Sequence, residues 1–211
     1  GSIMRLAPIP LFFNYNINEA IHFADLSSKI THGYAECVDA CKLMSNLIWR
    51  AMHNQELFVK TIQNDKEVFV LNCLSQIYDD SCKSIRNIIE GSFSKKNEEQ
   101  IFGAGYVISS LEAALWAIAQ SVDEKTPGEQ FEKAIIKAVN LREDADTTGA
   151  VCGQIIGAVV GYDAIPQHFK DGLYGLDMLL KISEELYNAS VEREEKRVSD
   201  LLKFLKGDDT K

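Results

Sequence analysis

Two carboxylates and a hydroxyl lie within four consecutive positions, as Asp144, Asp146 and Thr147. Such oxygen atoms are the ligands that Mg²⁺, Mn²⁺ and Ca²⁺ prefer in proteins. If the backbone is locally extended, the alternating spacing directs both carboxylates to the same side, and Thr147 adds a third oxygen. A long apolar segment follows, so the same residues could instead cap a helix and stabilise its dipole. Spacing alone leaves both interpretations open.

Glycine recurs at every fourth position of that apolar segment, as Gly149, Gly153, Gly157 and Gly161. Inside a helix each glycine costs about 1 kcal/mol relative to alanine. A stripe of four predicts that another backbone packs closely along the whole helix. On this interpretation a leucine at Gly157 would severely destabilise the protein.

The segment from Asp144 to Pro166 resembles the C-terminal signature of the ADP-ribosylglycohydrolases, with its Asp-Ala-Asp-Thr-x-Gly-Ala start, its glycine stripe and its Ile-Pro end. Three more segments match that family in the same order. Residues 1–8 resemble its Asn-Gly-x-x-Met-Arg-x-x-Pro loop, although the Asn is absent. Residues 31–33 resemble its Thr-His turn, and residues 103–107 its Gly-aromatic-Val step before a helix.

The resemblance implies an all-α orthogonal helical bundle that hydrolyses the bond between ADP-ribose and a modified protein side chain. It implies a site for two divalent ions, Mg²⁺ or Mn²⁺, with Asp144, Asp146 and Thr147 as ligands and Asp146 bridging both ions. The substrate-binding residues that it implies are Gly1, Ser2, Ile3, Met4, His32, Gly103, Gly105 and Tyr106. Backbone N–H groups of residues 1–4 would face the pyrophosphate, His32 the phosphates or ribose, and Tyr106 the nucleotide. Taken alone, His32 also fits a turn histidine bonded to nearby backbone, and Tyr106 a core aromatic.

Family members carry a further N-terminal stretch that has no counterpart here. It holds a Gly-Asp-x-x-Gly segment, an acidic residue assigned to catalysis and a Thr-Asp-Asp-Thr motif with half of the metal ligands. We therefore leave the catalytic residue unassigned and expect a half-site for about one ion, inactive without a missing N-terminal segment or partner chain. The alternatives are a non-catalytic ADP-ribose-binding or interaction module and a plain helical scaffold. Residues 207–210 faintly resemble the missing acidic motif but fit a disordered tail better.

The composition, 46% hydrophobic and 25% charged, is that of a globular protein. With 22 basic and 31 acidic residues the net charge is −9, which argues against a nucleic-acid partner. No apolar run reaches the ~20 residues that span a bilayer, so no membrane partner is expected. Five cysteines without a Cys-x-x-Cys pair indicate a reducing compartment, which we take to be the cytoplasm. Cys37 and Cys41 fit buried small side chains, with a metal or redox role as the alternative.

Apolar residues recur at helical spacing along most of the chain. The helices predicted from them cover residues 18–28, 34–53, 68–89, 110–121, 148–161 and 172–187, with another opened by Thr126-Pro127. Asn18 and Ser109 are the expected N-caps of the first and fourth of these helices, and Glu112 would complete a capping box with Ser109. The best strand candidates, residues 12–13 and 68–70, are short. We expect one helical domain over residues 1–190, followed by a charged C-terminal helix and tail over 191–211.

Overall fold

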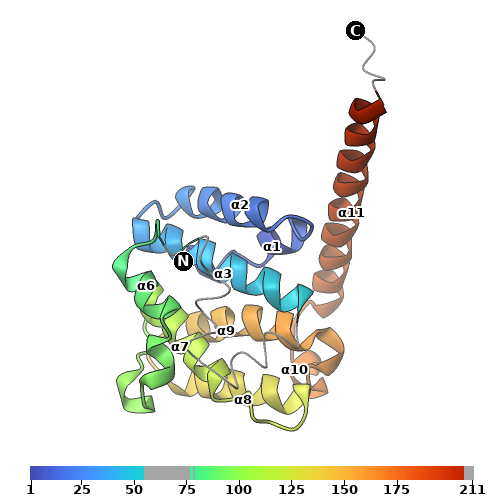
Figure 1. Cartoon of the computed structure of the whole chain (residues 1–211). Coiled ribbons are helices and arrows are strands. Elements are labelled where there is room, and N and C mark those ends of the chain that lie inside the picture. Colours follow the sequence, from blue (N-terminus) through green and yellow to red (C-terminus); the bar gives the residue numbers. More distant parts are fainter. Residues whose placement is uncertain (55–76, 78, 207–211) are drawn as a thin grey trace.

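The computed structural model describes residues 1–54, 77 and 79–206, and within these ranges it contains helices and loops but no strand (Figure 1). The all-α prediction is therefore confirmed. The α-helices are α1 (Pro8–Phe12), α2 (Ile17–Lys29), α3 (Ala35–His53), α6 (Lys83–Ile89), α7 (Val107–Ala119), α8 (Pro127–Asn140), α9 (Ala145–Val160), α10 (Gln167–Asp171) and α11 (Leu176–Lys206). Four short 3₁₀ segments are η1 (Ser2–Arg5), η2 (Ser92–Lys95), η3 (Glu98–Gln100) and η4 (Tyr162–Ala164).

The helices form two layers that meet along α3 and α9 (Figure 1). Helices α1, α2 and α3 make the first layer, and α7, α8 and α9 the second, with α6 and η2 at one end. Helix α11 rises along the opposite side and extends beyond the two layers. It is tied to the first layer where the Ser190 hydroxyl donates to the Phe12 carbonyl oxygen (2.7 Å) and Arg193 pairs with Glu19 (2.9 Å).

Helix α7 lies at the centre of the core, because nearly every residue on it is buried. Its small side chains, Ala113, Ala114 and Ala117, let neighbouring helices approach closely, and the indole N–H of Trp116 donates to the Lys96 carbonyl oxygen at 3.1 Å. The large core side chains of the helices around it include Leu43, Met44, Leu47, Ile48, Ile85, Ile88, Ile155 and Ile156.

Helix boundaries follow the predicted periodicity, with several corrections at the caps. Asn16, not Asn18, caps α2, because its side chain accepts from the amides of residues 18 and 19. Ser109 lies inside α7, and Glu112 accepts from Ser92 and Lys96 instead of closing a capping box. Thr126 does form the capping box that begins α8.

Other differences concern where helices begin and end. The helix predicted for residues 68–89 is interrupted before α6 by a turn at residues 79–80, and its earlier part, like the strand candidate at 68–70, lies outside the described residues. Phe12, the other strand candidate, ends α1, and Phe13 follows it. The segments predicted at 172–187 and from 191 onward are one continuous helix, α11, which crosses residue 190 without a break.

The glycine stripe on α9 does not have one structural role, so the prediction of close packing along its whole length is wrong. A Cβ atom on Gly149 would lie 3.1 Å from Cγ1 of Val139, whereas one on Gly157 would meet no atom of the described residues within 4 Å. Gly161 ends the helix with a φ of 77°, a conformation that L side chains rarely adopt. Among the residues that the structure describes, tight packing along the stripe is found only at Gly149, and backbone conformation explains the last glycine.

We therefore expect Gly157→Ala to stabilise the protein and Gly161→Ala to destabilise it. The first removes a flexible helix-interior glycine where space is open, for a gain of about 0.5–1 kcal/mol. The second forces a Cβ into a backbone conformation, with φ 77° and ψ 161°, that is essentially restricted to glycine, and costs about 1–3 kcal/mol. Thermal unfolding should shift Tm upward and downward respectively, by about 2–4 °C for each kcal/mol. A fall in Tm for Gly157→Ala would show that this helix face is packed after all.

Candidate functional site

The acidic segment lies at the start of α9, with Asp144 as the N-cap residue and Asp146 and Thr147 in the first turn. The helix thus begins three residues earlier than the predicted 148, and the segment is a helical start and not an extended strand. Two hydrogen bonds hold Asp144: its amide donates to the Gly103 carbonyl oxygen at 2.8 Å, and its own carbonyl accepts the Thr148 hydroxyl at 3.1 Å. The carboxylates therefore project from a fixed backbone.

Two residues with unusual backbone conformation precede Asp144. Arg142 and Glu143 have φ angles of 66° and 53°, and such positive values are uncommon outside glycine and cluster at functional sites. Both side chains are exposed. This left-handed pair brings the chain from the end of α8 into the N-cap of α9 within a very short loop.

The three oxygen ligands expected here face one another. The pKa of Asp144 is lowered because the Thr147 hydroxyl hydrogen-bonds its carboxylate and because the Asp146 carboxyl group lies within interaction range. The nitrogen of Gly1 is near enough to interact with this carboxylate, which places the N-terminal loop beside Asp144. Thr147 is buried, Asp144 half-buried and Asp146 exposed. The structure thus gathers one hydroxyl and two carboxylates, in agreement with the sequence-based grouping.

The loop before α7 packs directly on this acidic segment through two glycines. A Cβ atom on Gly105 would overlap Oδ2 of Asp144, and one on Gly103 would lie 2.9 Å from the Arg142 carbonyl oxygen. At Gly103 the neighbouring atom is backbone, so a side chain there would push the loop away from the start of α9, whereas a side chain at Gly105 would force the Asp144 carboxylate to turn aside. Gly103 and Gly105 are therefore explained by close approach, whether or not their backbone also contacts a ligand.

The N-terminal loop is held against α9 by one side chain, Gln154. Its amide group donates to the carbonyl oxygens of Ile3 (3.1 Å) and Met4 (3.0 Å), and its oxygen accepts the Ala7 amide at 2.8 Å. The Ser2 hydroxyl is buried and accepts hydrogen bonds from Ser28 at 3.0 Å and from the Cys41 thiol at 3.3 Å. The predicted use of this loop in ligand binding stays a prediction, but Ser2 and Ile3 are almost fully buried and the Met4 amide donates to the Gly1 carbonyl oxygen at 3.2 Å.

His32 lies next to Gly1, as the predicted site requires. A Cβ on Gly1 would be 2.8 Å from Cε1 of His32. The imidazole Nδ1 is 2.8 Å from the Thr31 hydroxyl oxygen, which also accepts from Arg5 at 2.8 Å. His32 is thus both a turn histidine with local partners and an exposed neighbour of the N-terminal loop. The structure is consistent with a role in the turn and with the predicted role in ligand binding.

Tyr106 is exposed at the rim of the site and is not a core aromatic. Its hydroxyl donates to Glu36, at the start of α3, and the same carboxylate accepts the Ser84 hydroxyl. Both hydrogen bonds, that of Ser84 first, lower the pKa of Glu36, and the bond to Glu36 raises the pKa of Tyr106 to about 12. Glu36 was missed from sequence because it belongs to no motif; its only signal is its place shortly after the Thr-His turn.

The donor set at Asp144, Asp146 and Thr147 suits one hard cation, since all three ligands are oxygens. No group of three or more His, Cys, Asp or Glu side chains that could hold a metal occurs in the described part of the chain. Cys41 and Cys152 are buried and free, while Cys37 and Cys82 are half-buried and free. Cys73 and residues 207–210 lie outside the described residues. In the helices that the structure describes, none is long and apolar enough to cross a membrane.

Comparison with known proteins agrees with this arrangement. Residues 1–196 match the family model described as ADP-ribosylglycohydrolase. ADP-ribosylarginine hydrolase Tri1 of Pseudomonas putida (strain GB-1) is 29% identical over 92% of this chain and 47% of its own length. ADP-ribosylhydrolase ARH3 of Homo sapiens is 22% identical over 89% of the chain and 57% of its own length. The chain thus spans about half the length of these relatives.

A solved structure, an ADP-ribosylglycohydrolase-related protein complex, superposes with a TM-score of 0.71 at 30% identity, covering 90% of this chain and 59% of that one. Similarity at this level extends through both helical layers and is not confined to the acidic segment. Since the family model also covers almost the whole chain, this protein belongs to the ADP-ribosylglycohydrolase family.

Proposed function

We propose that this chain carries one half of the active site of a hydrolase that removes ADP-ribose from modified protein side chains. The observation that carries the proposal is the convergence of Asp144, Asp146 and Thr147 at the start of α9, directly beneath Gly105 and beside Gly1. Relatives named as ADP-ribosylarginine hydrolase and ADP-ribosylhydrolase support the substrate class.

Asp144, Asp146 and Thr147 would hold a divalent cation, Mg²⁺ or Mn²⁺. When bound, such a cation orients substrate oxygens and lowers the pKa of a coordinated water. Two close carboxylates repel each other unless a positive charge lies between them, so their proximity here supports a cation at this position. Three protein oxygens leave the rest of a six-coordinate shell to water or ligand. A second ion would need carboxylates that the described residues do not place here.

The remaining predicted residues would bind the ADP-ribose portion. A chain with a net charge of −9 does not attract a pyrophosphate through its overall field, so local donors must do so. The candidates are the backbone N–H groups at the start of the N-terminal loop, whose Ile3 and Met4 carbonyls Gln154 holds, and the imidazole of His32. The Met4 amide is not among them, because it donates to the Gly1 carbonyl oxygen. Tyr106, exposed one residue after Gly105, would face the nucleotide.

A non-catalytic module that only binds ADP-ribose is the second candidate. It is favoured by the limited number of acidic ligands, because in the described part of the chain no third His, Cys, Asp or Glu side chain joins Asp144 and Asp146 in a group that could hold a metal. The two candidates differ in one respect: a hydrolase half-site gains turnover when the missing part is supplied, whereas a binding module does not.

We expect Mg²⁺ or Mn²⁺ to bind weakly, and Asp146→Asn to remove most of the binding, because it deletes one of two carboxylates. Titration calorimetry with millimolar metal measures the effect. Asp177→Asn is the matched control, since Asp177 is also an exposed aspartate in the first turn of a helix. Equal heats for the wild type and both variants would contradict the assignment.

We also expect the 211-residue chain alone to release ADP-ribose from modified protein poorly or not at all. Hydrolysis adds the hydroxyl of water to the ribose and a proton to the departing side chain, which requires a positioned acidic group that is unassigned here. Supplying the N-terminal portion of a relative, in the same chain or as a second one, should restore metal-dependent turnover. Robust, chelator-sensitive release by the isolated chain would overturn this expectation and direct attention to Asp208 and Asp209.

A further inference from the structure

Three helices meet at the carboxylate of Glu36, which lies in the first turn of α3. One carboxylate oxygen accepts the hydroxyl of Ser84 on α6, and the other accepts the hydroxyl of Tyr106, the N-cap residue of α7. These partners are 48 and 70 residues away along the chain. Glu36 is half-buried and Tyr106 is 54% exposed. A surface tyrosine is thus tied by its hydroxyl to an anchored acid.

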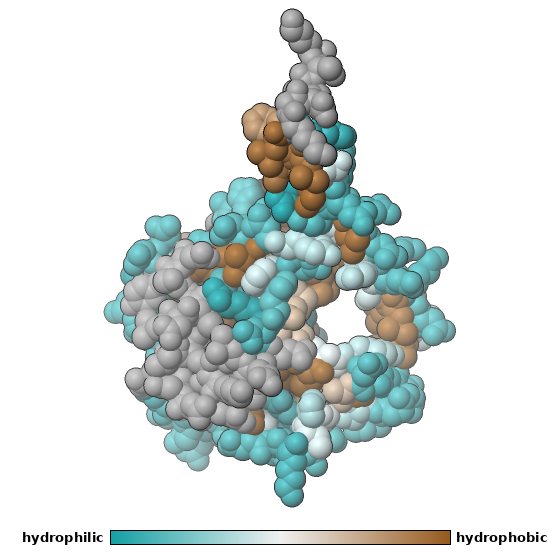
Figure 2. All heavy atoms as spheres, turned by 45° about the vertical axis from the view of Figure 1, so that its right-hand side comes forward, coloured by the Kyte–Doolittle hydropathy of each residue, from teal (hydrophilic) through white to brown (hydrophobic). Residues whose placement is uncertain are grey.

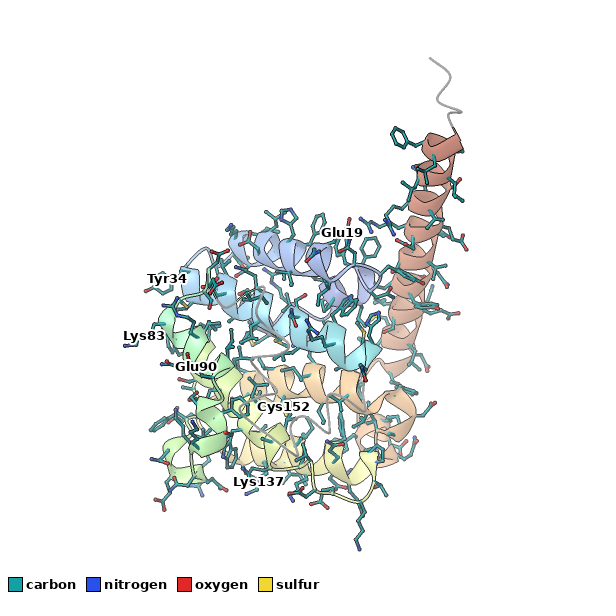
Figure 3. The ribbon with its side chains drawn as sticks, in the orientation of Figure 1. Glu19, Tyr34, Lys83, Glu90, Lys137 and Cys152 are labelled. Atoms are coloured by element: carbon teal, nitrogen blue, oxygen red, sulfur yellow. The ribbon has the colours of Figure 1, made fainter. Side chains whose placement is uncertain are left out.

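The position of this pair relative to the proposed half-site follows from Gly105. A Cβ atom on Gly105 would overlap the Asp144 carboxylate, and Tyr106 is the next residue. The Tyr106 backbone therefore lies beside the acidic site, and its exposed side chain reaches from there to Glu36. Tyr34, the N-cap residue of α3 and 70% exposed, is near enough to Tyr106 to help raise its pKa. Figure 3 shows Tyr34 at the outer end of α3, above α6.

Both oxygens of Glu36 are engaged by hydroxyl donors, which determines what it can do. The ionised carboxylate accepts one hydrogen bond from the Ser84 hydroxyl and one from the Tyr106 hydroxyl, and both bonds lower the pKa of Glu36. Because both of its oxygens already accept hydrogen bonds within the protein, we do not assign Glu36 as the catalytic carboxylate. Likewise, the Tyr106 hydroxyl is already used and does not donate to a ligand. What the pair leaves available is the face of the ring.

We propose that Glu36 is a positioning residue of the candidate site: its carboxylate, anchored by Ser84, fixes Tyr106 so that an ordered aromatic face is offered to the nucleotide part of the ligand. This rests on the proposed function. An exposed tyrosine without such a hydrogen bond exchanges among rotamers, so a ligand that contacts the ring would lose binding free energy in ordering it. Glu36 removes that ordering cost before the ligand arrives.

The hydrogen bond itself is testable without any ligand. In the full chain labelled at the tyrosine ζ carbon, NMR resolves the Tyr106 signal by comparison with Tyr106→Phe. Glu36→Ala should shift that signal at neutral pH and move its alkaline titration from about 12 toward the ordinary value near 10. The other titratable groups close to the hydroxyl are Tyr34 and Cys37, which stay in place in this variant. Glu184→Ala, an exposed glutamate on α11, is the control and should change neither quantity.

Calorimetry with ADP-ribose and Mg²⁺ tests the role of the pair in binding. Glu36→Ala and Tyr106→Phe should each weaken binding by about threefold to tenfold, as expected for one lost hydrogen bond. The double variant should be no weaker than either single variant, because Glu36 acts through the hydroxyl. Glu36→Gln, which still accepts from Tyr106, should restore most of the affinity. Tyr106→Ala should lose more, about tenfold or above, because the stacking face is gone.

The outcomes separate this inference from the proposed function. An unchanged Tyr106 signal in Glu36→Ala overturns the inference, as does wild-type affinity for ADP-ribose in that variant. Additive losses in the double variant also overturn it, because they mean that Glu36 acts independently of Tyr106. If the wild type itself fails to bind ADP-ribose while the NMR coupling is present, the proposed function fails, and with it the use of the ring for this ligand.

Discussion

The close approach of the loop at Gly103–Gly105 to the start of α9 is the constraint on which the rest of the site depends. The amide of Asp144 donates to Gly103, and the backbone of Gly105 lies against the Asp144 carboxylate. This contact fixes the direction of the acidic side chains and also determines where α7 begins and where Tyr106 emerges. A methyl group at Gly105 would displace the Asp144 carboxylate, and one at Gly103 would press on the Arg142 carbonyl oxygen, so the acidic half-site and the loop that leads to Tyr106 are not independent features.

Helix α9 connects this contact to the N-terminal loop. Its buried face packs Val151, Ile155 and Ile156 into the core, while Gln154, on its half-exposed face, holds three backbone groups of residues 3–7. Because α9 is anchored in the core and also binds the N-terminal loop, it holds that loop at a fixed distance from the acidic residues at its own start. The space-filling view shows that the assembly is nonetheless open, with a gap through the molecule on its right-hand side (Figure 2).

Sequence periodicity predicted most helices because burial of one face repeats with the helical turn, as in α3 and α8. Caps were less predictable: Asn16 and Asn18 are equally good cap residues, and only the structure shows which backbone amides are unpaired. The glycine stripe was misinterpreted because identical residues serve different purposes, close packing at Gly149 and a positive φ at Gly161. Glu36 escaped detection since its partners, Ser84 and Tyr106, are far away in sequence and leave no periodic signal.

The electrostatics of the site favour a role for a cation in either proposed function. Hydrogen bonds from Thr147 and Asp146 lower the pKa of Asp144, so this site carries negative charge at neutral pH. ADP-ribose adds the negative charge of its pyrophosphate, and the protein as a whole carries −9. Backbone amides supply only partial positive charge. A divalent cation held by these side chains would reduce their repulsion of an anionic ligand, so ligand binding and metal binding at the start of α9 are expected to be thermodynamically coupled.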